Sequence, residues 1–190
     1  MSNLIKIAVL GLALTQLQGC ATAVVGAAAT GTAVALDRRT TGVVVSDQEI
    51  EFRSLSRMKE ALGSNASSIS STSYNRQLLL TGQVPDDNTR NRATDVAKGI
   101  PDVRSVFNEL SVSGATSLTS TANDAAITSK VKARLLRDER TPGTKVKIVT
   151  EAGVVYLMGL VTRAEADVTT EIARTTSGVI KVVTLFEFIN

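Results

Sequence analysis

Histidine and tryptophan are absent from this chain of 190 residues, and cysteine occurs only once. Without histidine, neither a Ser-His-Asp triad nor a Cys-His pair can form, and the side chain that most often serves as general acid or base is missing. One cysteine and no histidine also cannot supply the nitrogen and sulfur ligands of the usual zinc sites. The composition therefore argues against the commonest hydrolases and against a zinc centre.

The motifs that hold phosphate groups or calcium are missing as well. The chain contains no G-x-x-x-x-G-K-[ST], G-x-G-x-x-G or D-x-[DN]-x-[DN]-G sequence. Ser129 and Lys130 are adjacent, but neighbouring residues on a helix point in different directions and do not form a nucleophile–base pair. The formal net charge of +3 is far from the dense positive field of a nucleic-acid-binding domain. We therefore expect no catalysis, no cofactor, no metal and no nucleic-acid partner.

The amino-terminal residues resemble the export signal of a bacterial lipoprotein. Lys6 gives a positive start, and residues 7–14 form an apolar run that is too short to span a bilayer, which needs ~20 residues. The run ends in Leu17-Gln18-Gly19-Cys20, which resembles a lipobox. In such signals the cysteine thiol receives a diacylglycerol, and the chain is then cut before the cysteine and acylated. We therefore predict a signal peptide over residues 1–19 and a lipid anchor at Cys20.

An incidental cysteine after an ordinary signal peptide is the alternative, but a lone thiol is a liability in an oxidising compartment. The residue after the cysteine is Ala21 and not aspartate. By analogy with the sorting rule of enterobacteria-like envelopes, this residue indicates an outer-membrane lipoprotein whose domains lie in the periplasm.

Residues 20–46 are expected to be the acylated cysteine and a flexible tether. The uncharged stretch 21–36 is short for a membrane span and is interrupted by glycine. Arg38 and Arg39 follow it, and two cations beside a lipid anchor can touch anionic head groups at roughly 1 kcal/mol each. A solvated linker is the alternative interpretation of the same residues.

The rest of the chain contains one pattern twice. Leu78–Val84 matches Val155–Val161, each with a central glycine, Gly82 and Gly159. The segments ending each unit, residues 102–108 and 178–184, also match. A glycine in mid-strand is normally a cost, so we expect a helix or another backbone to approach closely at both glycines.

Each unit is predicted to run helix, strand, strand, helix, strand. Asp47 is expected to open the first helix and Gly63 to end it, while Asn123 or Asp124 is expected to open its counterpart. In that counterpart Ile127, Val131 and Leu135 stand four residues apart on one face. Further elements are expected at the following residues: strands 67–73, 77–84, 103–112, 145–150, 154–161 and 179–188, and helices 86–98 and 163–176.

This unit resembles the BON domain. The lipobox, the short tether and two such units together resemble the dual BON-domain outer-membrane lipoproteins (the DolP type). The resemblance implies an α+β fold with two tandem αββαβ domains, over residues 47–113 and 114–190, each a three-stranded mixed sheet with two helices packed on it. Gly82, Gly159 and Gly178 are expected to be structural glycines.

The resemblance also implies binding to anionic phospholipid, such as phosphatidylglycerol, through the second domain, in support of cell-envelope integrity. Residues 114–190 carry 10 Lys+Arg against 8 Asp+Glu, whereas residues 44–113 carry 8 against 9. The cations gather on the first helix of the second unit. The lipid-binding residues are therefore predicted to be the following: Ile127, Lys130, Val131, Arg134 and Arg137.

Two further interpretations of this helix and of the function stay open. The helix can simply be the solvated face of a core element, because its start lacks the large aromatic residue that the family leads us to expect. The chain can also be a protein-interaction scaffold for envelope assembly or cell-wall-remodelling machinery, with other envelope proteins as its partners.

Overall fold

The structure, a computed structural model, describes residues 37–113 and 118–190. The predicted signal peptide, Cys20 and the tether up to Leu36 lie outside the described residues. Residues 37–190 form one compact unit. Among the described helices, none is long and apolar enough to cross a membrane.

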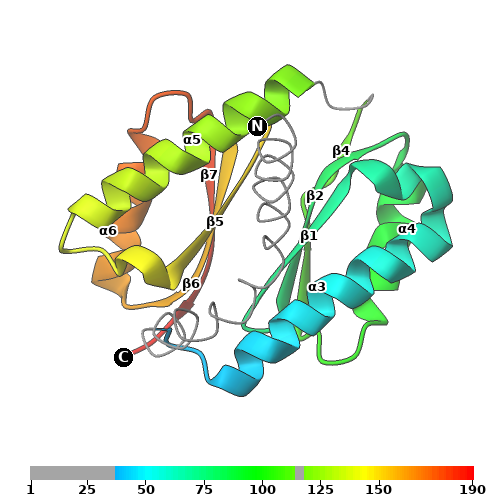
Figure 1. Cartoon of the computed structure of the whole chain (residues 1–190), viewed down its shortest axis with the longest axis horizontal. Helices are drawn as coiled ribbons and strands as arrows, with labels where there is room; N and C mark the ends of the chain where they lie inside the picture. Colours follow the sequence, from blue (N-terminus) through cyan, green and yellow to red (C-terminus); the bar gives the residue numbers. More distant parts are fainter. Residues whose placement is uncertain (1–36, 114–117) are drawn as a thin grey trace, which may run out of the picture. The chain divides into compact units, whose positions relative to one another are not determined.

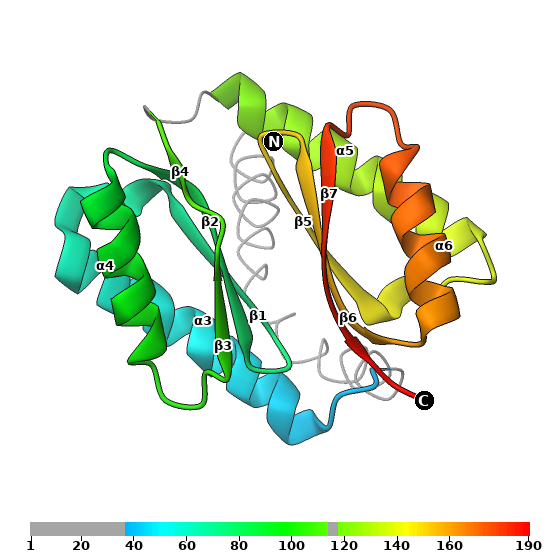
Figure 2. The same ribbon diagram turned by 180° about the vertical axis from the view of Figure 1, so that it is seen from behind.

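The elements of the first unit, domain 1, follow the predicted order. They are α3 (Thr41–Leu62), a 3-10 turn (Gly63–Ser68), β1 (Ile69–Tyr74), β2 (Gln77–Val84), α4 (Asp87–Lys98), β3 (Ser105–Asn108) and β4 (Ser111–Val112). Strand β2 pairs antiparallel with β1 and parallel with β3 and β4, so the sheet is mixed. Both helices cover the same face of this sheet (Figures 1 and 2).

Domain 2 repeats this arrangement. Its elements are α5 (Leu118–Arg137), a 3-10 turn (Gly143–Lys145), β5 (Val146–Glu151), β6 (Val154–Val161), α6 (Arg163–Arg174) and β7 (Lys181–Phe188). The sheet order is β5-β6-β7, antiparallel and then parallel, with both helices on one face (Figure 1). The predicted αββαβ fold with a three-stranded mixed sheet is confirmed for both units.

The last strand differs between the domains, and one side chain forms hydrogen bonds at the point where it differs. Asn108 Nδ2 donates to the Arg90 carbonyl oxygen (2.8 Å) and to Thr94 Oγ1 (2.6 Å) on α4, and Asn108 Oδ1 accepts from the Leu110 amide (3.1 Å). These bonds accompany the break between β3 and β4. The equivalent residue in domain 2 is Thr184, and β7 is continuous there. The single strand predicted over residues 103–112 is therefore wrong in detail.

Each domain has its own hydrophobic core between helices and sheet. In domain 1, Ile50 and Met58 of α3 meet Leu78 and Leu80 of β2. In domain 2, the corresponding cluster joins α5, β6 and α6. A third cluster contains side chains of both sheets, among them Tyr74, Leu79, Tyr156, Met158 and Leu185.

The aspartates expected to open the first helices lie inside them instead. The helices begin at Thr41 and Leu118, six residues before Asp47 and Asp124, and Thr40 accepts from the Val43 amide as the cap of α3 (3.3 Å). Both aspartates are buried. Their carboxylates reach across to the β-hairpin turns, which is why a polar residue here does not mark a helix end.

The two strand glycines are under different constraints. At Gly82 the backbone φ is +116°, and a Cβ would stand 1.8 Å from the Ser68 carbonyl oxygen. At Gly159 the nearest atom to such a Cβ would be the Lys145 carbonyl oxygen, at 3.3 Å. The predicted close approach is thus made by backbone from the segment that leads into the neighbouring strand, and it is much tighter in domain 1. Gly178 also has a positive φ, of +96°, and a Cβ there would press on Ile127.

Candidate functional site

Helix α5 presents one face to the core of domain 2 and the opposite face to solvent. Ile127 and Val131 are fully buried among β6 and α6 side chains. Their four-residue spacing places them on the core side, so the prediction that they contact lipid is corrected. The exposed side chains of the helix include the following: Ala126, Ser129, Lys130, Lys132, Ala133, Arg134, Leu136 and Arg137.

Arg134 has a structural role that its position in the sequence did not indicate. Its guanidinium donates to the Ile172 carbonyl oxygen (2.8 Å), to Thr176 Oγ1 (2.7 Å) and to Thr175 Oγ1 (3.1 Å). These atoms belong to the carboxyl-terminal end of α6, where backbone carbonyls lack partners and the helix dipole favours a cation. Arg134 therefore joins α5 to α6, and most of its donors are not available to a lipid.

The exposed face of α5 keeps three cations whose charge is not opposed. Lys130, Lys132 and Arg137 form no ion pair with any residue in the described part of the chain. The acidic residue of the helix, Asp124, is buried and accepts from the Ala152 and Gly153 amides, both at 2.8 Å. The surface of α5 is consequently positive over its carboxyl-terminal half, residues 130–137, with Leu136, 54% exposed, as its large apolar side chain. Lys132 and Leu136 were not among the residues predicted to bind lipid, although both are exposed on this helix.

A shallow hollow adjoins the end of this helix. It has a volume of about 530 Å³ and is lined by Arg134, Arg137, Asp138, Glu139, Arg140 and Ile172. Arg140 pairs with Asp138 at 2.7 Å, and this hydrogen bond lowers the pKa of Asp138 to about 2. The carboxylate thus stays charged and neutralises Arg140, which leaves Arg134, Arg137 and Glu139 as the charged side chains of the hollow that form no ion pair within the described residues.

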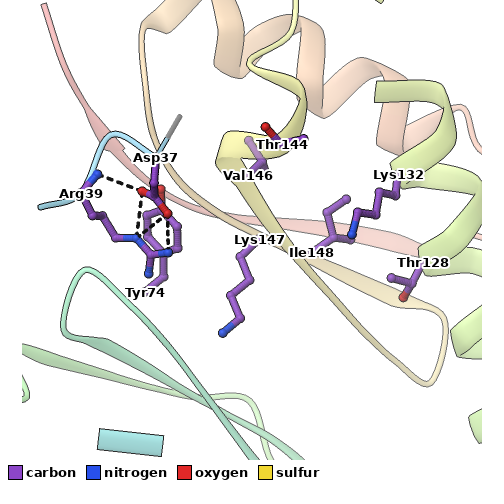
Figure 3. A pocket seen from close by; sticks show the side chains of 9 residues that line it. All are labelled: Asp37, Arg39, Tyr74, Thr128, Lys132, Thr144, Val146, Lys147 and Ile148. Carbon is purple, nitrogen blue, oxygen red and sulfur yellow. Dashed lines mark hydrogen bonds and ion pairs between the residues drawn. The ribbon is translucent and has the colours of Figure 1, made fainter. Parts of the chain in front are cut away.

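A second pocket lies on the other side of α5, and Figure 3 shows its lining. Lys132 and Thr128 come from α5, while Lys147 and Ile148 come from β5. Arg39 enters from the segment that precedes α3. Two of the three cations are engaged: Lys147 binds Glu51 at 2.6 Å, and Arg39 binds Asp37 and Asp47, each at 2.7 Å. This pocket is therefore mostly neutralised from within, and Lys132 is its cation without an ion pair among the described residues.

The arginines before α3 are bound to protein. The two terminal guanidinium nitrogens of Arg38, Nη1 and Nη2, donate to the Glu165 carboxylate at 2.7 Å each, and Nη1 also donates to the Leu160 carbonyl oxygen (2.8 Å). The hydrogen bond from Arg38 lowers the pKa of Glu165 to about 2. Arg39 lies over the Tyr74 ring, 3.9 Å from its centroid. The sequence left two interpretations of these arginines open, contact with lipid head groups or a place in a solvated linker. The structure contradicts both, because each guanidinium group binds carboxylates of the folded protein.

Further contacts cross from one domain to the other. The Tyr74 hydroxyl donates to the Lys145 carbonyl oxygen (3.1 Å). Asn75 Nδ2 donates to Glu187 (2.7 Å), which also pairs with Arg104 (3.3 Å). Burial, followed by the Glu109 carboxylate, raises the pKa of Tyr156 to about 12. With the arginines above, these groups hold the two domains together.

Side chains that could bind a metal ion do not gather in the described residues. No group of three acidic, cysteine or histidine side chains there is close enough to hold a metal ion. The arrangement offers instead a cationic helix surface on a rigid domain, a geometry suited to attracting an anionic surface.

Comparison with known proteins identifies both units. The BON domain family matches residues 46–114 and 123–190. Outer membrane lipoprotein DolP of Haemophilus influenzae is 38% identical over 191 residues, covering 100% of this chain and 99% of the relative. The 21 kDa hemolysin of Actinobacillus pleuropneumoniae is 31% identical over 155 residues, 81% of this chain and 80% of that protein. Osmotically-inducible protein Y of Escherichia coli is 39% identical over 105 residues, 54% of this chain and 52% of that protein.

Proposed function

The chain belongs to the BON-domain family, as an outer-membrane lipoprotein with two BON domains, and from this premise we propose that its second domain binds anionic phospholipid through the exposed face of α5. The protein acts without catalysis. Its acyl anchor keeps it at the membrane, and the contact made by domain 2 supports the integrity of the cell envelope.

The observation that carries this proposal is the unopposed positive charge of α5. Lys130, Lys132 and Arg137 are exposed, and the helix has no exposed carboxylate from residue 121 to residue 137. A basic residue close to an anionic bilayer contributes about 1 kcal/mol. Three such residues therefore supply only about 3 kcal/mol, which is weak for a free protein but sufficient for a tethered one.

The contact is electrostatic and shallow, because the face between these cations is made of small side chains. Ala126, Ser129 and Ala133 cannot reach among acyl chains, and Leu136 at the end of the helix is half-exposed. Binding should consequently weaken as salt rises, since exposed charges are screened over about 10 Å at 0.1 M.

The test is co-sedimentation of the unacylated chain, residues 21–190, with vesicles. Residues 37–190 form one compact unit with its own hydrophobic cores, so the anchor is not needed for folding. We expect binding to vesicles that contain phosphatidylglycerol and little binding to pure phosphatidylcholine. The double variant Lys130→Glu, Arg137→Glu should bind the anionic vesicles about thirtyfold more weakly, a loss of about 2 kcal/mol.

The matched control is Lys98→Glu, Lys181→Glu, which changes the net charge equally at two exposed cations outside α5. This variant should lose much less affinity. Equal losses for both variants would mean that overall charge alone attracts the protein, and equal binding of the unaltered chain to both vesicles would contradict an anionic lipid site.

A further inference from the structure

Helix α3 of domain 1 exposes a stripe of large apolar side chains that the fold does not require. Val45 is 62% exposed, Phe52 is 73% exposed and Leu55 is 52% exposed. Positions 45 and 52 lie two turns apart, and position 55 is one turn further on, so the three side chains share one side of the helix. The buried side of α3, with Ile50 and Met58, faces the sheet instead.

Comparison with domain 2 shows that the fold forms without large apolar side chains at these exposed positions. The two first helices superimpose with an offset of 77 residues, as Asp47 and Asp124 both bind a hairpin turn and Ile50 and Ile127 are both buried. Under the same offset Val45, Phe52 and Leu55 correspond to Ala122, Ser129 and Lys132, in that order. The same exposed positions are thus small or charged in domain 2.

The stripe continues into a hollow at the carboxyl-terminal end of α3. The hollow has a volume of about 510 Å³, and Leu55, Ala66 and Ile69 contribute its apolar lining. Lys59 stands at its edge, where a lysine can keep its charge in water while its stem lies along apolar surface. Near the stripe, Glu49 is neutralised by its ion pair with Arg53.

We infer that this apolar stripe rests in the bilayer surface that carries the lipid anchor, with Phe52 inserted at the level of the upper acyl chains. The size of the patch favours this occupant over a protein. A stable protein interface buries about 800 Å² on each partner, whereas a single buried aromatic side chain accounts for about 150–250 Å². Three partly exposed side chains are too few for a specific interface, yet a tethered helix with Phe and Leu on one face is suited to an interfacial position.

The anchor makes such a small contact effective. In the mature chain α3 begins 21 residues after Cys20, and linkage by a short segment converts a weak contact into an intramolecular one. This contact is apolar, so it does not depend on lipid charge, in contrast to the cationic contact of α5. The two contacts can therefore succeed or fail separately.

The absence of tryptophan allows a clean test with single-tryptophan variants of the acylated protein in vesicles. We expect the fluorescence emission of the Phe52→Trp variant to shift to shorter wavelength. We also expect it to be quenched by lipids that carry bromine on the acyl-chain carbons nearest the head group. Quenching should be at least about twofold stronger than for the Ile180→Trp control, because Ile180 is an equally exposed apolar residue of domain 2 (80%).

Three further arms decide what occupies the stripe. Quenching of the Phe52→Trp variant should be the same in phosphatidylcholine and in phosphatidylglycerol vesicles, and should survive Lys130→Glu, Arg137→Glu. Adding Leu55→Asp to the Phe52→Trp variant should reduce quenching to the level of the Ile180→Trp control. The protein should stay folded, because the Leu55 side chain is exposed. Water-like emission in both vesicle types would overturn the inference, as would a blue shift that requires an added envelope protein. Quenching only with phosphatidylglycerol would overturn it too, in favour of the α5 contact alone.

Discussion

Asp47 and Asp124 hold the same position in the two domains, and each places its buried carboxylate against the hairpin turn of its own sheet. Asp47 accepts from the Asn75 and Arg76 amides at 2.8 and 2.7 Å, as Asp124 does from Ala152 and Gly153. All four turn residues have positive φ values, as a type I′ turn requires. The carboxylate thus stabilises a turn that Arg76 and Ala152, both at positive φ, do not favour by themselves.

Removing the carboxylate of Asp124 should therefore destabilise domain 2. Asp124→Ala leaves two amides of the turn without an acceptor, and we expect a loss of about 2–3 kcal/mol in the free energy of unfolding. Urea denaturation of residues 21–190 measures it. Asp167→Ala, at an exposed position of α6, is the control and should change stability by no more than about 0.5 kcal/mol. Equal effects of the two substitutions would contradict the proposed role of the turn contact.

The two strand glycines should differ in their tolerance of alanine. Gly82→Ala places a Cβ 1.8 Å from a carbonyl oxygen at a φ of +116°, and we expect a loss of more than about 3 kcal/mol. Gly159→Ala meets its nearest atom at 3.3 Å and should cost about 1 kcal/mol. Thermal unfolding of both variants provides the comparison. A larger loss for Gly159→Ala would show that the two positions are not constrained as the structure indicates.

The ion pair between Arg38 and Glu165 should give an acid-dependent contribution to stability. The pKa of Glu165 falls from an ordinary 4.5 to about 2 in the folded protein, so the folded state binds its proton less readily than the unfolded state. The contribution is complete above about pH 4.5 and is lost as the pH falls toward 2. Because the pair is partly exposed to solvent, it amounts to only about 1 kcal/mol.

Glu165→Gln isolates this effect, because glutamine can still accept from the Thr162 amide that the glutamate oxygen binds (2.8 Å). Urea denaturation between pH 6 and pH 2.5, run on both proteins, should show the variant less stable at pH 6 and the difference shrinking in acid. A difference that grows as the pH falls would have the wrong sign for this ion pair.

Tyrosine ionisation should be delayed in the folded protein. The chain has two tyrosines, and burial raises the pKa of both, that of Tyr156 to about 12. The folded state therefore holds these protons more tightly, and its advantage, complete below pH 10, is lost as the pH rises through 12. Ultraviolet absorbance of tyrosinate, with Tyr156→Phe as the reference, measures the shift. Half-ionisation of both tyrosines by pH 10 in the folded protein would refute it.

The sequence predicted the elements well because their signals are local. The continuous apolar run of β6, the Gly-containing turn before it and the four-residue spacing on α5 are signals carried by residues close together in the chain. The duplicated pattern then supplied the order of elements in both domains. The helix starts were placed too late because an aspartate favoured at a helix start is here bound by a hairpin 28 residues further along the chain.

The candidate site was predicted less well. The lipid anchor, the cationic helix and the repeat were evident in the sequence, and the spacing of Ile127 and Val131 already placed them together on one helix face. Which cations stay free was decided by the tertiary structure alone. Arg134 is bound by the end of α6, 38 residues away, and Arg38 by Glu165, 127 residues away. Composition counts charges, but only folding brings a distant carbonyl or carboxylate within hydrogen-bond distance of a cation and engages its donors.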